Sequence, residues 1–201
     1  MTWEEVKGNI YPFLIWTKQN QALLSMIVHR NFLDLSVGYV VRIEVSAWGN
    51  IAVKVTGHLL KEWKITETML YEQAIENLKK EHYQIESLQE MLTETLGVFQ
   101  EIPEEYNMKN LWVLTNEKMW YGAAAMLLGK SFFREVLGEK DYYIVPSSTH
   151  ELILIPADGF GGLADMNQMV KQVNQEQVEV KDRLNDHVYY YNGVTGEIEI
   201  P

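Results

Sequence analysis

The chain has 201 residues, no cysteine and a formal net charge of −11 at pH 7. Its length suits one large domain or two small ones, and its hydrophobic share of 47% supplies a folded core. Without cysteine, disulfides, thiolate metal sites and a cysteine nucleophile are excluded. Nucleic acid and anionic membrane surfaces are not expected as partners, because the only basic cluster is Lys79-Lys80.

Membrane insertion and secretion are also not expected. No apolar run reaches the ~18 residues that a membrane helix needs. The first residues, MTWEEVKGN, lack the basic and apolar regions of a signal peptide. We therefore expect a cytoplasmic protein.

In the N-terminal half, the pattern predicts a strand at residues 11–17, in which Pro12 indicates an edge strand or a strand start. It further predicts strands at 33–45 and 51–55. Helices are expected at 20–27, at 56–63 and from Thr66 to about Glu81. In the strand 33–45 apolar residues occupy every odd position. This alternation predicts that Leu33, Leu35, Val37, Tyr39 and Val41 face a core. It places Asp34, Ser36 and Arg42 on the opposite face, most of which points toward water. Trp48-Gly49-Asn50 is the expected turn of an antiparallel hairpin.

In the C-terminal half, three short apolar runs predict buried strands at residues 111–114, 142–145 and 152–155. A helical segment closed by Gly138 separates the first two runs. A last helix is expected at 163–174 with Met166, Met169, Val170 and Val173 on one face. A terminal hairpin follows, residues 188–191 returning as 197–200 around Asn192-Gly193.

The fold class expected from this pattern is α+β, with two subdomains that each contain a mainly antiparallel sheet with helices packed on it. The acidic stretch 83–110 has weak periodicity and is the expected boundary region. We predict an N-terminal subdomain at 1–95, an acidic connector at 96–109 and a C-terminal subdomain at 110–201.

The loop Pro146-Ser147-Ser148-Thr149-His150-Glu151 holds the residue types of a nucleophilic site. Ser147 and Ser148 are the candidate nucleophiles, and His150 and Glu151 the candidate base and orienting acid. A triad normally converges from separate elements, whereas these residues are neighbours in a strand–turn–strand. Proline, serine and threonine are also common turn residues, so the turn interpretation is favoured.

A second candidate is the loop Gly159–Gly162. Gly159, Gly161 and Ala164 match G-x-G-x-x-A before a helix, which can cradle phosphate. A dinucleotide site follows the first strand of a parallel βαβ unit, but this loop follows an expected antiparallel hairpin. Asp158 would also repel phosphate. A flexible glycine loop is the favoured interpretation, and no cofactor is expected.

The histidines do not predict a metal site. His58 with Glu62 and His82 with Glu86 have i,i+4 spacing, but two ligands do not make a zinc site. The aromatic residues can line a pocket or a partner surface: Trp112, Trp120, Tyr121, Tyr142, Tyr143 and Tyr189-Tyr190-Tyr191. Consecutive tyrosines on a strand point to both faces, so at least one must leave the local core.

The chain contains the motifs HRNFLDL at 29–35, LKEWKIT at 60–66, LYE at 70–72, LTNE at 114–117, GAA at 122–124, VPSS at 145–148, HE at 150–151 and DHVY at 186–189. These motifs resemble those of an uncharacterised domain-of-unknown-function family of anaerobic Firmicutes. The resemblance implies that this chain corresponds to the C-terminal part of such proteins. A weaker likeness links the chain to another uncharacterised bacterial family, YtpQ-like. Neither resemblance implies an activity.

The leading functional hypothesis is a non-catalytic cytoplasmic binding or interaction module with a protein or small-molecule partner. Around residues 11–17 or 189–191 we expect either a homodimer contact or an apolar patch on the monomer where a further N-terminal region docks. The alternative is a hydrolase or nucleotide-binding enzyme that uses Ser147–Glu151 or Gly159–Gly162.

Overall fold

The computed structural model describes residues 1–45, 49–91, 111–159, 162–176 and 178–201. The chain divides into two compact units, Met1–Glu81 and His82–Pro201. Each unit contains an antiparallel sheet with helices, so the α+β prediction is confirmed. The expected connector at 96–109 and Trp48 of the expected hairpin turn lie outside the described residues. Gly49 and Asn50, which we predicted in that turn, belong instead to the returning strand, where they pair with Val45 and Glu44.

The first unit contains α1 (Trp3–Val6), η1 (Lys7–Asn9), β1 (Ile10–Trp16), α2 (Gln21–Leu24), β2 (His29–Phe32), β3 (Leu35–Val45), β4 (Gly49–Lys54), α3 (Gly57–Trp63) and α4 (Glu67–Leu78). Strand β3 is central: β1 pairs with residues 35–41 on one side, while β2 and then β4 pair with it on the other. Within the described part of the chain, β1 pairs with β3 only, as Pro12 predicted.

The alternation in β3 predicted one face correctly. Leu35, Val37, Tyr39 and Val41 are all buried. Leu33 does not belong to this strand: it is exposed and has a φ of 54°, because residues 33 and 34 turn the chain from β2 into β3. The prediction for Leu33 was therefore wrong, and β2 was missed.

The opposite face of β3 is also buried, contrary to the expectation that most of it meets water. Ser36 and Arg42 are both buried. Arg42 forms an ion pair with Glu81, and its guanidinium lies 3.9 Å from the ring centre of Tyr11. The charge is therefore paired and covered rather than solvated.

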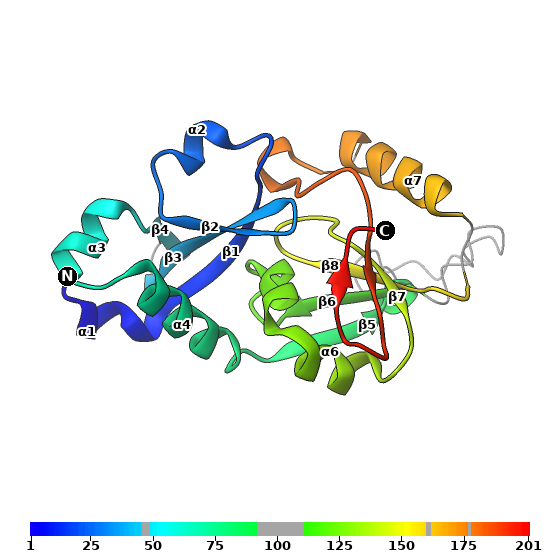
Figure 1. The fold of residues 1–201 in the computed structure, drawn as a ribbon, viewed down its shortest axis with the longest axis horizontal. Helices are drawn as coiled ribbons and strands as arrows, with labels where there is room; N and C mark the ends of the chain where they lie inside the picture. Colours follow the sequence, from blue (N-terminus) through cyan, green and yellow to red (C-terminus); the bar gives the residue numbers. More distant parts are fainter. Residues whose placement is uncertain (46–48, 92–110, 160–161, 177) are drawn as a thin grey trace. The chain divides into compact units, whose positions relative to one another are not determined.

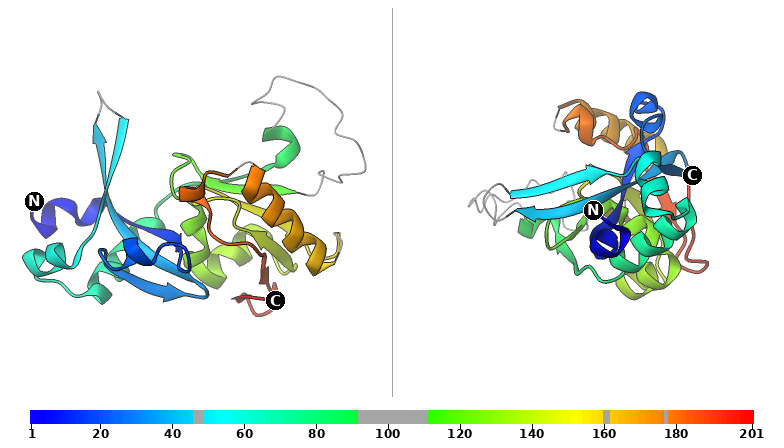
Figure 2. Two further views of the ribbon diagram at one scale, coloured as in Figure 1. Left: turned by 90° about the horizontal axis from the view of Figure 1, so that it is seen from above. Right: turned by 90° about the vertical axis from the view of Figure 1, so that its left-hand side faces the viewer.

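The β3–β4 hairpin is confirmed, with Val41 opposite Val53 and Ile43 opposite Ile51. The far end of the hairpin, where Val45 pairs with Gly49, projects from the rest of the first unit (Figure 2). For this reason Ile51 and Val53 are exposed, although the alternation suggested a core position, and only Val55 is buried.

Helix α4 begins at its predicted N-cap, where the Thr66 hydroxyl accepts a hydrogen bond from the N–H of Met69 at 3.2 Å. Leu70, Ala74 and Leu78 form a fully buried stripe at intervals of four residues. Met69 lies outside this narrow stripe and is exposed. Helix α4 contacts β1, and the Asn77 side chain donates to the backbone carbonyls of Lys7 and Ile10.

A polar network joins β2, β3 and α4. Arg30 donates two hydrogen bonds to Glu67, at 2.8 and 2.7 Å, and lies on the ring of Tyr71. The hydroxyl of Tyr39 also donates to Glu67. Burial alone raises the pKa of Glu67, but the bonds from Arg30 and Tyr39 outweigh it and hold that pKa below its usual value. Burial, and then the bond to Glu67, raise the pKa of Tyr39.

The second unit contains β5 (Tyr83–Ser87), β6 (Trp112–Asn116), η4 (Gly122–Leu128), α6 (Gly129–Leu137), β7 (Tyr142–Val145), β8 (Leu152–Pro156), α7 (Leu163–Glu176), η5 (Val180–Asp182), β9 (Tyr189–Tyr191) and β10 (Ile198–Glu199). The sheet order is β10-β9-β7-β8-β6-β5, with antiparallel pairing throughout the described strands. Residues 83–87 were not predicted as a strand and were assigned to the N-terminal subdomain; they form β5, which pairs with β6 and belongs to this unit.

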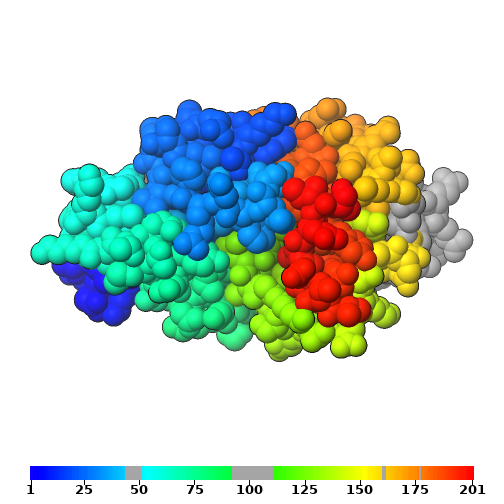
Figure 3. All heavy atoms as spheres, in the orientation of Figure 1, coloured from blue at the N-terminus to red at the C-terminus, as the bar shows by residue number. Residues whose placement is uncertain are grey.

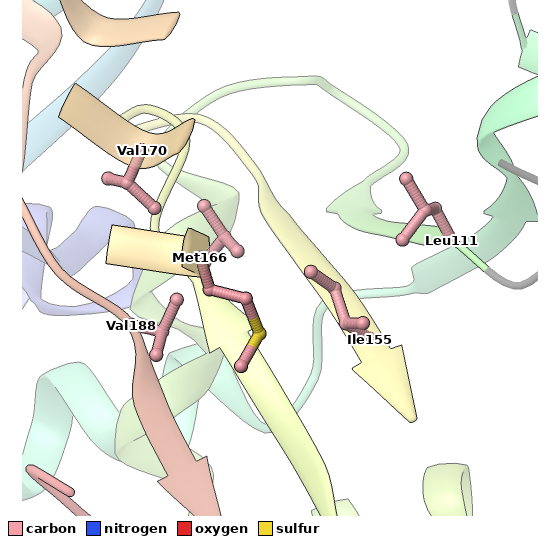
Figure 4. Packing of buried hydrophobic residues seen from close by; sticks show 6 residues of the cluster. Leu111, Ile155, Met166, Val170 and Val188 are labelled. Carbon is pink, nitrogen blue, oxygen red and sulfur yellow. The ribbon is translucent and has the colours of Figure 1, made fainter. Parts of the chain in front are cut away.

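Helices cover both faces of the second sheet (Figure 1). Met166 and Val170 of α7 pack with Val145, Ile155 and Val188 on one face (Figure 4). Phe133 of α6 contacts the ring of Tyr191 on the other. Val173, predicted on the apolar face of α7, is exposed. None of the helices in the described ranges is both long and apolar enough to cross a membrane.

The C-terminal hairpin completes this sheet, as predicted. Tyr189 and Tyr191 are fully buried. Tyr190 points to the other face, where its hydroxyl donates to Asp141 at 2.7 Å; this bond is the main reason that its pKa rises to about 12. The hairpin turn packs beside α6, where Arg134 donates to the carbonyl of Val194 (Figure 3).

Candidate functional site

The turn between β7 and β8 holds the four candidate catalytic residues. The hydroxyl of Ser147 lies 3.3 Å from a carboxylate oxygen of Glu151 and donates to it. The hydroxyl of Ser148 accepts a hydrogen bond from the backbone N–H of His150 at 3.0 Å. Both serines are buried. These are local side-chain bonds of the kind that stabilise turns.

The imidazole of His150 has a partner on each nitrogen. Its Nδ1 accepts from the backbone N–H of Tyr121 at 3.2 Å, and its Nε2 lies 3.7 Å from a carboxylate oxygen of Asp182. A neutral ring that accepts at Nδ1 carries its proton on Nε2, facing Asp182. Among the described residues, no hydrogen bond joins this ring to the hydroxyl of Ser147 or Ser148.

The segment that His150 contacts, residues 116–122, forms a tight loop after β6, which we call the aromatic loop. Asn116 is buried, and its side chain binds the backbone of Trp120 twice: it accepts from the N–H and donates to the carbonyl, both at 2.9 Å. Met119 and Tyr121 on either side have φ values of 48° and 58°. Such left-handed conformations are strained in residues with a Cβ atom.

The aromatic loop and the β7–β8 turn are joined by several bonds. The hydroxyl of Thr115 donates to the carbonyl of His150 at 2.9 Å, and the N–H of Ala123 donates to the carbonyl of Thr149. At Gly122 an added Cβ atom would lie 2.3 Å from the carbonyl oxygen of His150. Only glycine permits this approach, so the sequence places glycine where the two segments meet.

Three rings form a stack at this junction. The ring centres of Trp120 and Tyr121 are 5.6 Å apart, those of Tyr121 and His150 are 5.7 Å apart, and each pair is tilted by 21°. Trp120 and Tyr121 are half-buried, whereas the side chain of Met119 is 55% exposed. The arrangement thus presents apolar and aromatic surface on a rigidly held loop.

The candidate glycine loop is described only in part, because Phe160 and Gly161 lie outside the described residues. The N–H of Gly159 donates to the carbonyl of Pro156 at 3.2 Å. Strand β8, which precedes the loop, pairs antiparallel with both β6 and β7. The loop therefore does not follow the parallel strand that a dinucleotide site requires.

In the described ranges, no three His, Asp or Glu side chains gather closely enough to hold a metal ion. Of the aromatic candidates, the structure brings Trp120 and Tyr121 to His150. Sequence reasoning did not predict the left-handed backbone of Met119 and Tyr121 or the hydrogen bonds from Asn116 that hold the loop. The available signal was the order T-N-E-K-M-W-Y-G, in which an asparagine and a glycine enclose two aromatic residues directly after a buried strand.

The chain was compared with known proteins at three levels. The comparison with curated proteins and the comparison with solved structures each give no match. A family model described as a family of unknown function, DUF5688, matches residues 1–193. The resemblance to an uncharacterised family is therefore confirmed over nearly the whole chain, and the protein belongs to the DUF5688 family.

Proposed function

We propose that the protein is a non-catalytic cytoplasmic binding module that recognises a protein partner through the aromatic loop. The main supporting observation is that two left-handed residues, Met119 and Tyr121, enclose the exposed side of one loop, whereas Leu33 and Lys64 are single left-handed residues at a turn and a helix C-cap. Each such residue costs ~1–2 kcal/mol. Strain of this kind persists only where surrounding contacts impose it, and it is concentrated at functional sites. Here the bonds from Asn116 and His150 impose it.

The side chains that the aromatic loop exposes support a protein as the partner. Met119 is flexible and polarisable, which suits an adaptable apolar contact. Trp120 combines a large apolar ring with one hydrogen-bond donor, a combination enriched at interface hot spots. Glu117 and Lys118 are exposed beside them and supply a polar rim. The expected counterpart is a partner surface with an apolar pocket.

The hydrolase alternative receives less support. A nucleophilic serine needs a base within hydrogen-bond reach. The His150 ring is instead engaged by Tyr121 and Asp182, and the two serine hydroxyls are engaged within their own turn. The nucleotide-binding alternative depends on the Gly159–Gly162 loop, whose antiparallel setting lacks the geometry of a phosphate-binding βαβ unit.

The binding proposal is tested by photo-cross-linking in the source cells. A photoreactive phenylalanine analogue replaces Met119 in the full chain. The matched control carries it at Met26, a methionine in the first unit that is at least as exposed. We expect a discrete cross-linked protein from position 119 that is absent from position 26. No adduct at 119, or the same adducts at both positions, would contradict the proposal.

The enzyme alternative has its own test. A fluorophosphonate probe labels activated serine nucleophiles covalently. We expect the purified protein to remain unlabelled under conditions that label a serine hydrolase added as a positive control. Labelling that disappears in Ser147→Ala or Ser148→Ala would instead support the hydrolase.

A further inference from the structure

The outer side of β4 is an open sheet edge. In the part of the chain that the structure describes, β4 pairs with β3 and with no other strand. The pairing of β1 with β3 ends at Val41, so beyond that residue β3 and β4 continue as a two-stranded ribbon (Figure 2). A two-stranded ribbon is marginally stable in water, and its unpaired backbone groups favour the addition of another strand.

Hydrogen bonding within the hairpin determines which backbone groups of β4 point outward. The N–H of Val55 donates to the carbonyl of Tyr39 at 2.9 Å. Because hydrogen-bonded pairs alternate along an antiparallel ladder, the groups of Val53 and Ile51 point toward β3. Those of Asn50, Ala52 and Lys54 point outward, so an added strand must pair through these three residues.

The side chains on this edge are apolar where β4 leaves the body of the unit. Ile51 is 44% exposed and Val53 36% exposed, and both lie on the same face as Ile43. The strand sequence from Gly49 to Lys54 contains no acidic residue and a single basic one. It therefore lacks the acidic charge that would make most surfaces of a chain with net charge −11 repel a second copy.

We propose that this edge pairs with the same edge of a second copy of the chain, with a two-fold axis at Ala52. In this antiparallel register Ile51 lies opposite Val53 of the second copy, and Val53 lies opposite its Ile51. Lys54 falls opposite position 50, which is an asparagine, so no like charges face each other. The result is a continuous antiparallel ribbon of four strands.

The neighbouring registers fit less well. An axis at Ile51 sets Val53 opposite Gly49, and an axis at Val53 sets Ile51 opposite a residue beyond the end of β4. Other edges are less suited to self-pairing. Strand β1 carries Pro12, which cannot donate a backbone hydrogen bond, and β10 has only two residues. The inference is independent of the proposed function, because the aromatic loop belongs to a different unit.

The test uses the absence of cysteine from the natural chain. Ala52→Cys places one thiol at the proposed axis, and Val194→Cys places one at an exposed turn. With a short bismaleimide, we expect Ala52→Cys to form cross-linked dimers at concentrations where Val194→Cys stays monomeric. Equal or slower cross-linking of Ala52→Cys would overturn the proposal.

A second measurement needs no added cysteine, so it also applies if Ala52→Cys disturbs the ribbon. Sedimentation equilibrium of the full chain should show a reversible dimer, and Ile51→Glu should weaken its association constant at least tenfold. Val194→Glu adds the same charge elsewhere and should leave association unchanged, with circular dichroism confirming that both variants fold. A wild-type chain that stays monomeric, or an Ile51→Glu variant that dimerises normally, would refute the pairing.

Discussion

Replacing Met119 by glycine should stabilise the protein while weakening its binding to a partner. Left-handed backbone costs a residue with a Cβ atom ~1–2 kcal/mol, and glycine avoids that cost. Glycine also makes the unfolded chain more flexible, which removes ~0.4–1 kcal/mol of the gain. Because the side chain of Met119 is 55% exposed, little packing is lost. The net expectation is a gain between ~0 and ~1.6 kcal/mol in unfolding free energy, with a central value of ~0.8 kcal/mol.

Urea denaturation followed by circular dichroism measures this change. The matched control is Met69→Gly, at an exposed methionine within α4, where glycine should cost ~1 kcal/mol because the backbone is helical. Opposite signs for two Met→Gly substitutions would establish that the aromatic loop is strained. If Met119→Gly destabilises the protein as much as Met69→Gly does, the loop is not strained and the proposed function loses its basis.

Four further predictions concern the fold. Leu35→Ala should cost ~2–5 kcal/mol in urea denaturation because Leu35 is fully buried, whereas Leu33→Ala in the exposed turn should change stability little. Because the pKa of Glu67 is lowered on folding, its contribution should be lost as pH falls below ~4, and Glu67→Gln should flatten that acid limb. The raised pKa of Tyr39 acts in the opposite direction, so stability should fall as pH rises above ~10. Tyr39→Phe should reduce that loss but not remove it, because the pKa of Tyr190 is also raised. Truncation after Asp186 removes a buried strand and should abolish cooperative melting; a truncated chain that melts as sharply as the full one would show that the hairpin is dispensable.

The sequence predicted strands correctly where the spacing of the apolar residues fits only one secondary structure. The alternation through Leu35, Val37 and Tyr39 correctly predicted a buried face of β3, and Tyr39 on that face donates to Glu67 of α4. The same pattern failed at Leu33, because an apolar residue in a turn looks like one more strand position. It also failed for Arg42, because a guanidinium paired with Glu81 and covered by Tyr11 is buried through contacts that no local pattern reports.

The candidate site was predictable in part. The abundance of turn-forming residues at Ser147 and Ser148 indicated a structural role, and their local hydrogen bonds agree with it. The aromatic loop could not be derived in the same way. Its geometry depends on His150 receiving a bond from Tyr121, a residue 29 positions away, and on left-handed backbone that residues other than glycine rarely adopt.

The central claim is that the aromatic loop binds a protein partner, and calorimetric titration of the cross-linked partner tests it most directly. The purified partner is titrated into the wild-type chain, Trp120→Ala and Trp112→Ala; Trp112 is a partly exposed tryptophan in β6 of the same unit. A hot-spot tryptophan contributes ~2 kcal/mol or more, which corresponds to roughly a 30-fold change in Kd. We predict this loss for Trp120→Ala and an unchanged Kd for Trp112→Ala. An unchanged Kd for Trp120→Ala would contradict the account.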